Sequence, residues 1–150
     1  MGAYPSTTTV IDSTQSAVAK SQGAAIPFVI EREYDLDTLI TGKLANADIV
    51  NLFTLPANHV VLATWIKITE IAVGCSSTCT LKLRFGTTDI GATADILTDN
   101  TVATGGSATV ALPLNNGTSA TLVNLVAAIG GGTTTTNPTV QVRLLVCNMA

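Results

Sequence analysis

The chain has 150 residues, of which 47% are hydrophobic and only 11% are charged, and its net charge is −3. This length suits a single domain that buries enough apolar surface to fold without disulfides or metals. The seven lysines and arginines are scattered, so the basic stripe that nucleic acid requires is missing. No apolar run reaches the roughly 18 residues of a membrane span. Residues 1–20 have neither a basic start nor an apolar stretch, so we expect no secretory signal and synthesis in a cytoplasm.

Residues 1–23 are small and polar and show little periodic hydrophobicity. We therefore expect an extended N-terminal arm that a partner orders, and the alternative is a terminus without a binding role. Fully extended, the arm would span roughly 70–80 Å at about 3.3 Å per residue, which is enough to reach a neighbouring subunit. The candidate interface residues in it are Tyr4, Pro5, Val10 and Ile11.

From Ala24 onward, short stretches of apolar and β-branched residues alternate with turn residues, which favours strands. Strands are predicted over residues 26–34, 49–55, 60–73, 79–85, 108–114, 122–129 and 140–147. The 60–73 and 79–85 strands are expected to form a hairpin, and residues 86–106 a long loop with one short strand. In the 49–55 strand, Ile49, Asn51 and Phe53 should face one way. No convincing helix is found, so residues 24–150 are predicted to form an all-β, single-domain antiparallel β-sandwich or jelly-roll barrel.

The three cysteines are Cys75, Cys79 and Cys147. Cys75 and Cys79 flank a turn, so a disulfide between them is possible if their Cβ atoms approach within about 4.5 Å. Two free thiols are the alternative. A zinc-type site would lack ligands because His59 is the single histidine. We expect no cofactor, and whether the 86–106 loop binds an ion is left open.

Catalytic machinery is hard to place on this sequence. Nucleophilic catalysis would have to use His59 as its base, and a histidine at the start of a strand is usually a surface residue. Glu31 and Glu33 lie two residues apart, which is typical of solvated charges on an edge strand. Trp65 lies in the most apolar strand, where core or subunit interface is expected. We therefore predict a protein that is not an enzyme.

The stretch from Tyr34 to about Asp95 contains "TGKLANADIVNLFTLPANHVVLATWIKITEIA", a short turn and then "TLKLRFGTTDIGATADI". These strand-and-turn motifs resemble the tailed-phage capsid decoration proteins, also called cement or head-stabilising proteins. The resemblance implies a structural virion protein on the outer capsid surface, made in the bacterial host cytoplasm. It also implies that the protein bridges capsomers as a homo-oligomer, with a trimer favoured, and that its partner is the major capsid protein rather than nucleic acid or membrane.

Two other functions remain open. A self-polymerising fibre subunit could donate its N-terminal arm as a strand to the next copy. A receptor- or glycan-binding β-sandwich of a fibre or tail would present an exposed aromatic or acidic cluster, and the sequence shows neither.

Overall fold

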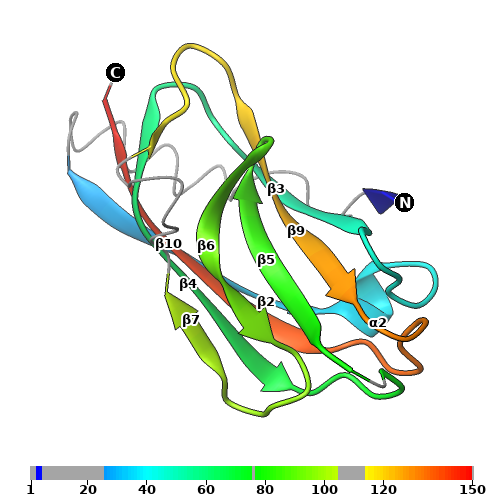
Figure 1. Cartoon of the computed structure of the whole chain (residues 1–150). Helices are drawn as coiled ribbons and strands as arrows, with labels where there is room; N and C mark the ends of the chain where they lie inside the picture. The colour runs from blue at the N-terminus through cyan, green and yellow to red at the C-terminus, as the bar shows by residue number, and fades with distance from the viewer. Residues whose placement is uncertain (1–2, 5–25, 76, 105–113, 150) are drawn as a thin grey trace.

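Two β-sheets pack face to face in the computed structural model, which describes residues 3–4, 26–75, 77–104 and 114–149 (Figure 1). The front sheet contains, in order, β1 (Ala3–Tyr4), β3 (Ile49–Leu55), β9 (Thr121–Ile129), β5 (Cys79–Phe85) and β6 (Thr88–Asp95). The back sheet contains, in order, β2 (Pro27–Asp35), β10 (Thr139–Asn148), β4 (His59–Glu70) and β7 (Val102–Thr104), and β8 (Leu114–Asn115) also pairs with β4. One helical turn, α2 (Leu36–Leu39), follows β2. The prediction of an all-β sandwich is confirmed.

The core lies between the sheets and follows from the alternation in the sequence. In β5 the odd-numbered residues Cys79 to Phe85 are buried, whereas the residues between them are partly exposed. In β10, Val140, Val142 and Leu144 are buried in the same cluster. Each fully buried Val or Leu side chain contributes about 1.5–3 kcal/mol relative to an exposed one. Alternate residues of facing strands therefore hold the two sheets together.

Strict alternation fails in β3. Leu52 and Phe53 are adjacent in the chain and yet both are buried. The register against β9 shifts between Asn51 and Phe53, as in a β-bulge, which inserts an extra residue and turns the next side chain to the opposite face. The expectation that Phe53 shares a face with Ile49 and Asn51 is therefore wrong.

The predicted hairpin of residues 60–73 and 79–85 is also wrong. β4 pairs with β10, β7 and β8 in the back sheet, while β5 pairs with β6 and β9 in the front sheet. Each strand turns its apolar face to the common core, so the connection at residues 71–78 crosses from one sheet to the other. The hairpin in this region is instead formed by β5 and β6, around the turn at Gly86 and Thr87.

Residues 86–106 therefore contain more regular structure than the long loop that the sequence predicts. They contribute β6, with eight residues, and β7, with three. Ile90 and Ala94 of β6 are buried, while Asp89 and Asp95 lie on its outward side. The predicted 108–114 strand lies outside the described residues except for Leu114, and the predicted arm does so except for Ala3 and Tyr4.

One end of the sandwich, which we call the α2 end, is held by the buried Asn137. Its side-chain Oδ1 accepts hydrogen bonds from Leu44 N at 3.0 Å and from the Thr134 hydroxyl, and its Nδ2 donates to Gly42 O at 2.9 Å. Its backbone N–H donates to the Asp37 carboxylate at 3.1 Å. Asn137 thus joins the loop before β10 to the segment that follows α2.

The opposite end, which we call the turn end, is held by Asn116. Its Oδ1 accepts from His59 N at 2.8 Å and its Nδ2 donates to Pro56 O at 2.6 Å. Gly117, which follows Asn115 and Asn116 in the turn, has a φ of +61°, a left-handed conformation that glycine adopts without steric cost. Asn116 therefore connects the β3–β4 turn to the turn before β9.

Candidate docking surface

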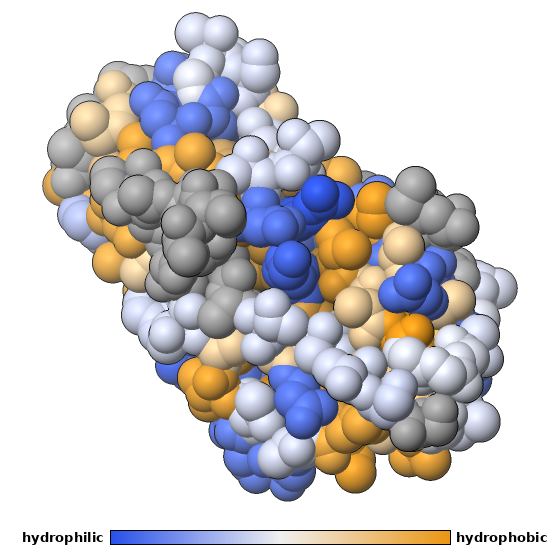
Figure 2. Space-filling model, in the orientation of Figure 1, coloured by the Kyte–Doolittle hydropathy of each residue, from blue (hydrophilic) through white to orange (hydrophobic). Residues whose placement is uncertain are grey.

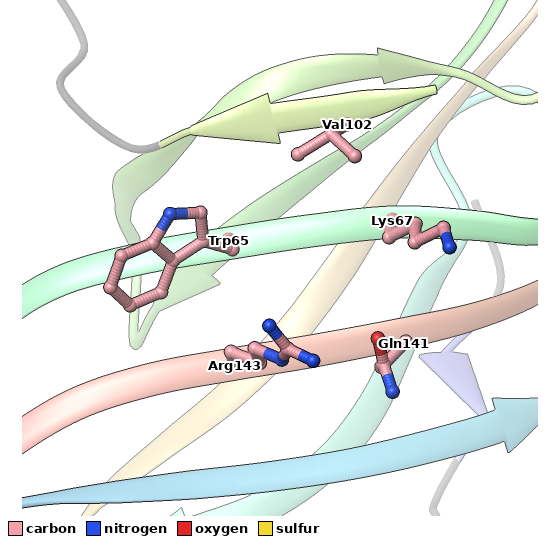
Figure 3. A pocket seen from close by; sticks show the side chains of 5 residues that line it. All are labelled: Trp65, Lys67, Val102, Gln141 and Arg143. Atoms are coloured by element: carbon pink, nitrogen blue, oxygen red, sulfur yellow. The ribbon is translucent and has the colours of Figure 1, made fainter. Parts of the chain in front are cut away.

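The outward side of the back sheet presents three cross-strand rows of side chains. The first row is Val29, Leu145 and Ala63; the second is Glu31, Arg143, Trp65 and Thr104; the third is Glu33, Gln141, Lys67 and Val102. Each row runs across neighbouring strands, because residues in register share a face of the sheet. We call the group Val29, Glu31, Glu33, Trp65, Lys67, Val102, Gln141 and Arg143 the Trp65 face. A close-up shows five of these side chains rising from β4, β7 and β10 (Figure 3).

Trp65 is the centre of this face. It projects outward from β4 and is partly buried among its neighbours, so it is not part of the core. Two shallow hollows flank it, one reaching Lys67 and Val102 and the other reaching Val29. Val102 and Val29 are 56% and 49% exposed, so the rim of the face offers apolar surface. The sequence predicts that Trp65 lies in the core or at a subunit interface. In the structure its side chain faces outward, so it is available to contact a partner.

The charges of the Trp65 face balance one another. Arg143 forms an ion pair with Glu31, and Gln141 Nε2 donates a hydrogen bond to the same carboxylate at 2.9 Å. Both charged side chains are more than 40% exposed, so this pair adds little to folding stability. A neutral surface centred on Trp and Arg suits a protein partner, because these residues dominate interface energetics. It does not suit a polyanion such as nucleic acid.

Arg143 is not among the interface residues expected from the sequence. It lies at an outward position in the alternating run of β10, one residue from the buried Val142 and Leu144. That position was a visible signal that its side chain faces outward. Its pairing with Glu31, 112 positions earlier in the chain, depends on strand register that the sequence does not reveal.

The outward side of the front sheet is different. Its middle holds Lys82 and Arg84, which both form ion pairs with Asp89, at 3.1 and 3.0 Å. In the space-filling view of this side, hydrophilic residues occupy the middle of the face with hydrophobic residues to either side (Figure 2). No aromatic side chain lies on the outward side of the described β3, β9, β5 or β6 residues.

The remaining interface candidates fall in the N-terminal region. Tyr4 lies in β1 and pairs with Val50 of β3. Pro5, Val10 and Ile11 lie outside the described residues. The structure therefore does not bring Tyr4 and Trp65 together, because they belong to different sheets.

All three cysteines carry free thiols. Burial, together with a smaller contribution from a hydrogen bond with Cys79, raises the pKa of the Cys75 thiol to about 12. Thiolate is the species that forms disulfides, so a thiol with such a pKa oxidises slowly at neutral pH. A Cys75–Cys79 disulfide remains a prediction.

His59 is 1% exposed, so the expectation of a surface histidine is wrong. Its Nδ1 lies 3.0 Å from both Pro56 O and Ala57 O, and therefore carries the proton that it donates to these carbonyls. Its Nε2 is buried and has no partner among the described residues. The ring lies edge-on to Phe28, with 6.1 Å between centroids.

The acidic residues of the 86–106 region have structural partners. Asp89 binds Lys82 and Arg84, Asp95 accepts a hydrogen bond from Leu97 N at 2.9 Å, and Asp99 accepts one from Asn100 N at 2.8 Å. Among the described residues, no three His, Cys, Asp or Glu side chains gather as a metal site would require. The described part of the chain also contains no helix with the length and apolar character of a membrane span.

No family model matches the chain, and no curated protein matches its sequence. Solved structures match its fold. A chain in the capsid of Ralstonia phage GP4 gives a TM-score of 0.59 at 15% identity, over 99% of this chain and 99% of that chain. A chain in the acidic stable capsid structure of Helicobacter pylori bacteriophage KHP30 gives a TM-score of 0.55 at 16% identity, over 85% of this chain and 91% of that chain. The shared feature is the fold.

Proposed function

We propose that this chain is a structural virion protein that decorates the outer face of a phage capsid and stabilises it by bridging neighbouring capsomers as a homotrimer. The observation that carries the proposal is the fold likeness to a chain in the Ralstonia phage GP4 capsid, which extends over 99% of both chains. A likeness of that extent includes the whole sandwich rather than one motif. The strand-and-turn motifs between Tyr34 and Asp95 support the same role independently.

The Trp65 face is the proposed contact with the major capsid protein. Its surface is apolar around Trp65 and balanced in charge, as protein interfaces are. A decoration protein repeats one modest contact many times around a shell, so each contact need not be strong. The proposed second contact is the arm, residues 1–23, which clasps a neighbouring subunit or capsid protein.

The test is binding of the purified chain to capsids that lack it, measured by co-sedimentation. Trp65→Ala removes the proposed central contact, and a hot-spot residue contributes at least about 2 kcal/mol, or about 30-fold in Kd. We expect Arg143→Ala to weaken attachment less. The matched control is Arg84→Ala, since Arg84 also sits on a strand and pairs with a carboxylate, but on the front sheet.

Attachment that is equal in Trp65→Ala and Arg84→Ala, with unfolding midpoints unchanged, would remove the Trp65 face from the proposal. Failure of the native chain to bind capsids would overturn the decoration role. Open-ended filaments of the purified chain would then favour the fibre subunit, and binding to immobilised glycans would favour the receptor module. Removal of residues 1–23 should weaken attachment while the sandwich stays folded.

A further inference from the structure

The sheet edges of the sandwich differ in how well they resist pairing with another strand. The β2 edge carries Glu31, Arg32, Glu33 and Asp35, the β6 edge carries Asp89 and Asp95, and β7 has only three residues. Charge and short length are the usual protections of an exposed edge. β3 has neither protection, because its seven residues, IVNLFTL, include no charged side chain.

A strand does lie on the β3 edge, but it covers little of it. β1 pairs in parallel with β3, Ala3 with Ile49 and Tyr4 with Val50. On this side, residues 51–55 of β3 have no strand partner among the described residues, and their other side pairs with β9. A two-residue parallel ladder is shorter than ordinary strands and gains little stability alone. Residues 51–55 of the β3 edge can therefore accept a strand donated by another chain, because β1 pairs only with Ile49 and Val50.

The connection between β1 and β2 permits donation to another copy. β1 lies beside the start of β3 near α2, whereas β2 begins at the opposite end of the sandwich (Figure 1). Residues 5–26 join them, a contour of roughly 70 Å at about 3.3 Å per residue. The ten-residue β10 spans about 33 Å by the same measure. A connection twice that length reaches the β3 edge of a neighbouring copy as well as its own.

We infer that β3 is the acceptor edge for β1 of a second copy, so that copies of the chain are joined by exchanged parallel strands. The pairing is the same within and between chains, so exchange loses no contact, and copies held close together in an oligomer offer an equivalent edge at high effective concentration. The contact is heterologous, since β1 of one copy meets β3 of the next, and it closes into a ring such as a trimer when the rotation closes. This inference deepens the proposed function by naming the partner of the arm.

Cysteine pairing in the purified chain tests the exchange without any capsid. In A3C/I49C the two new thiols lie at register partners. On oxidation we expect covalent oligomers on a non-reducing gel that collapse to monomer with reductant. The matched control is A3C/T93C, because Thr93 is exposed on β6 at the far edge of the same sheet. The chain with only its native cysteines controls for links through Cys75.

Monomers with an internal disulfide would overturn the inference, because β1 would then stay on its own chain. The absence of any new disulfide would overturn it too. As a second measurement, light scattering of a chain lacking residues 1–4 should show a smaller oligomer than the full chain forms. An unchanged number of copies per oligomer would contradict exchange. A chain that exchanges strands but does not bind capsids would contradict the proposed function alone, and one that binds capsids without exchange would contradict this inference alone.

Discussion

The two ends of the sandwich are each held by one asparagine, but in different ways. At the α2 end, Asn137 is 3% exposed and its side chain pairs with Leu44, Thr134 and Gly42. At the turn end, Asn116 is partly exposed, and beside it the buried His59 Nε2 has no partner among the described residues. The Asn137 side chain thus has partners for both its oxygen and its nitrogen, although the buried Tyr34 hydroxyl just before α2 has none among the described residues. At the turn end it is the His59 ring beside the holding asparagine that lacks a partner.

This difference shows where the fold depends on polar contacts between distant parts of the chain. Asn137 and Asp37 are 100 residues apart, so their contact ties the end of β2 to the start of β10. A buried polar group that is paired supports a specific arrangement, whereas loss of its partner costs the full desolvation penalty. We therefore expect the α2 end to be the more sensitive to substitution.

The largest effect is expected for Asn137→Ala. It removes four side-chain hydrogen bonds in a buried site, the longest of them to Leu36 O at 3.5 Å, and leaves Gly42 O without this donor. The free energy of unfolding should fall by about 3 kcal/mol, since each unmade buried hydrogen bond costs about 1–3 kcal/mol and the losses overlap. Urea denaturation measures this as a lower midpoint with an unchanged slope. Thr133→Ala, at an exposed position in the same loop, should change the midpoint little.

A smaller effect is expected for Asn116→Ala at the turn end. Water can replace part of what is lost, because Asn116 is partly exposed. Unfolding free energy should fall by about 1–2 kcal/mol, measured by the same titration. If Asn116→Ala cost as much as Asn137→Ala, the contrast between the two ends would be wrong.

The smallest effect concerns Asp37 and appears as a dependence on pH. A hydrogen bond from Lys43, followed by one from the Asn137 backbone, lowers the pKa of Asp37 below its ordinary value of 3.8. A lowered pKa in the folded state adds stability above pH 3.8 and loses it as the pH falls through the lowered value. Asp37→Asn should therefore be less stable than the native chain at pH 6, and the gap should close in strong acid.

Thermal unfolding from pH 2 to pH 7 measures that gap. Lys43→Met removes the main cause of the lowered pKa, so it should reproduce part of the loss at pH 6. A constant gap across this range would show that Asp37 acts through packing and not through its charge.

Whether a strand residue faces the core or the solvent could largely be predicted from the sequence, because the alternation of apolar and polar residues reports the face directly. The inward residues of β10, from Val140 to Val146, are buried as their spacing predicts. β6 was missed because Thr, Asp and Gly carry little hydrophobic signal there. The bulge at Leu52 and Phe53 also has no mark in the sequence, since both positions suit either face.

The choice of strand partner could not be predicted in the same way. Alternation gives the face of β4 and β5 but not the sheet to which each belongs, so neighbours in the chain were mistaken for neighbours in space. The docking surface could not be predicted in full for the same reason, since it depends on which strands are neighbours. Trp65 was a candidate from its place in the most apolar predicted strand, whereas its row with Arg143 and Glu31 needs the registers of three strands.

The position of β10 has a kinetic consequence. It lies between β2 and β4 in the back sheet, and its register partners are more than 65 residues away in the chain, as for Thr139 and Glu70. Closing such long loops must precede any gain from pairing, so folding in the range of milliseconds to seconds is expected for this topology. Until β10 arrives, β2 and β4 each have an unfilled edge. Newly made copies thus pass through a period in which joining the wrong chain competes with finishing their own sheet.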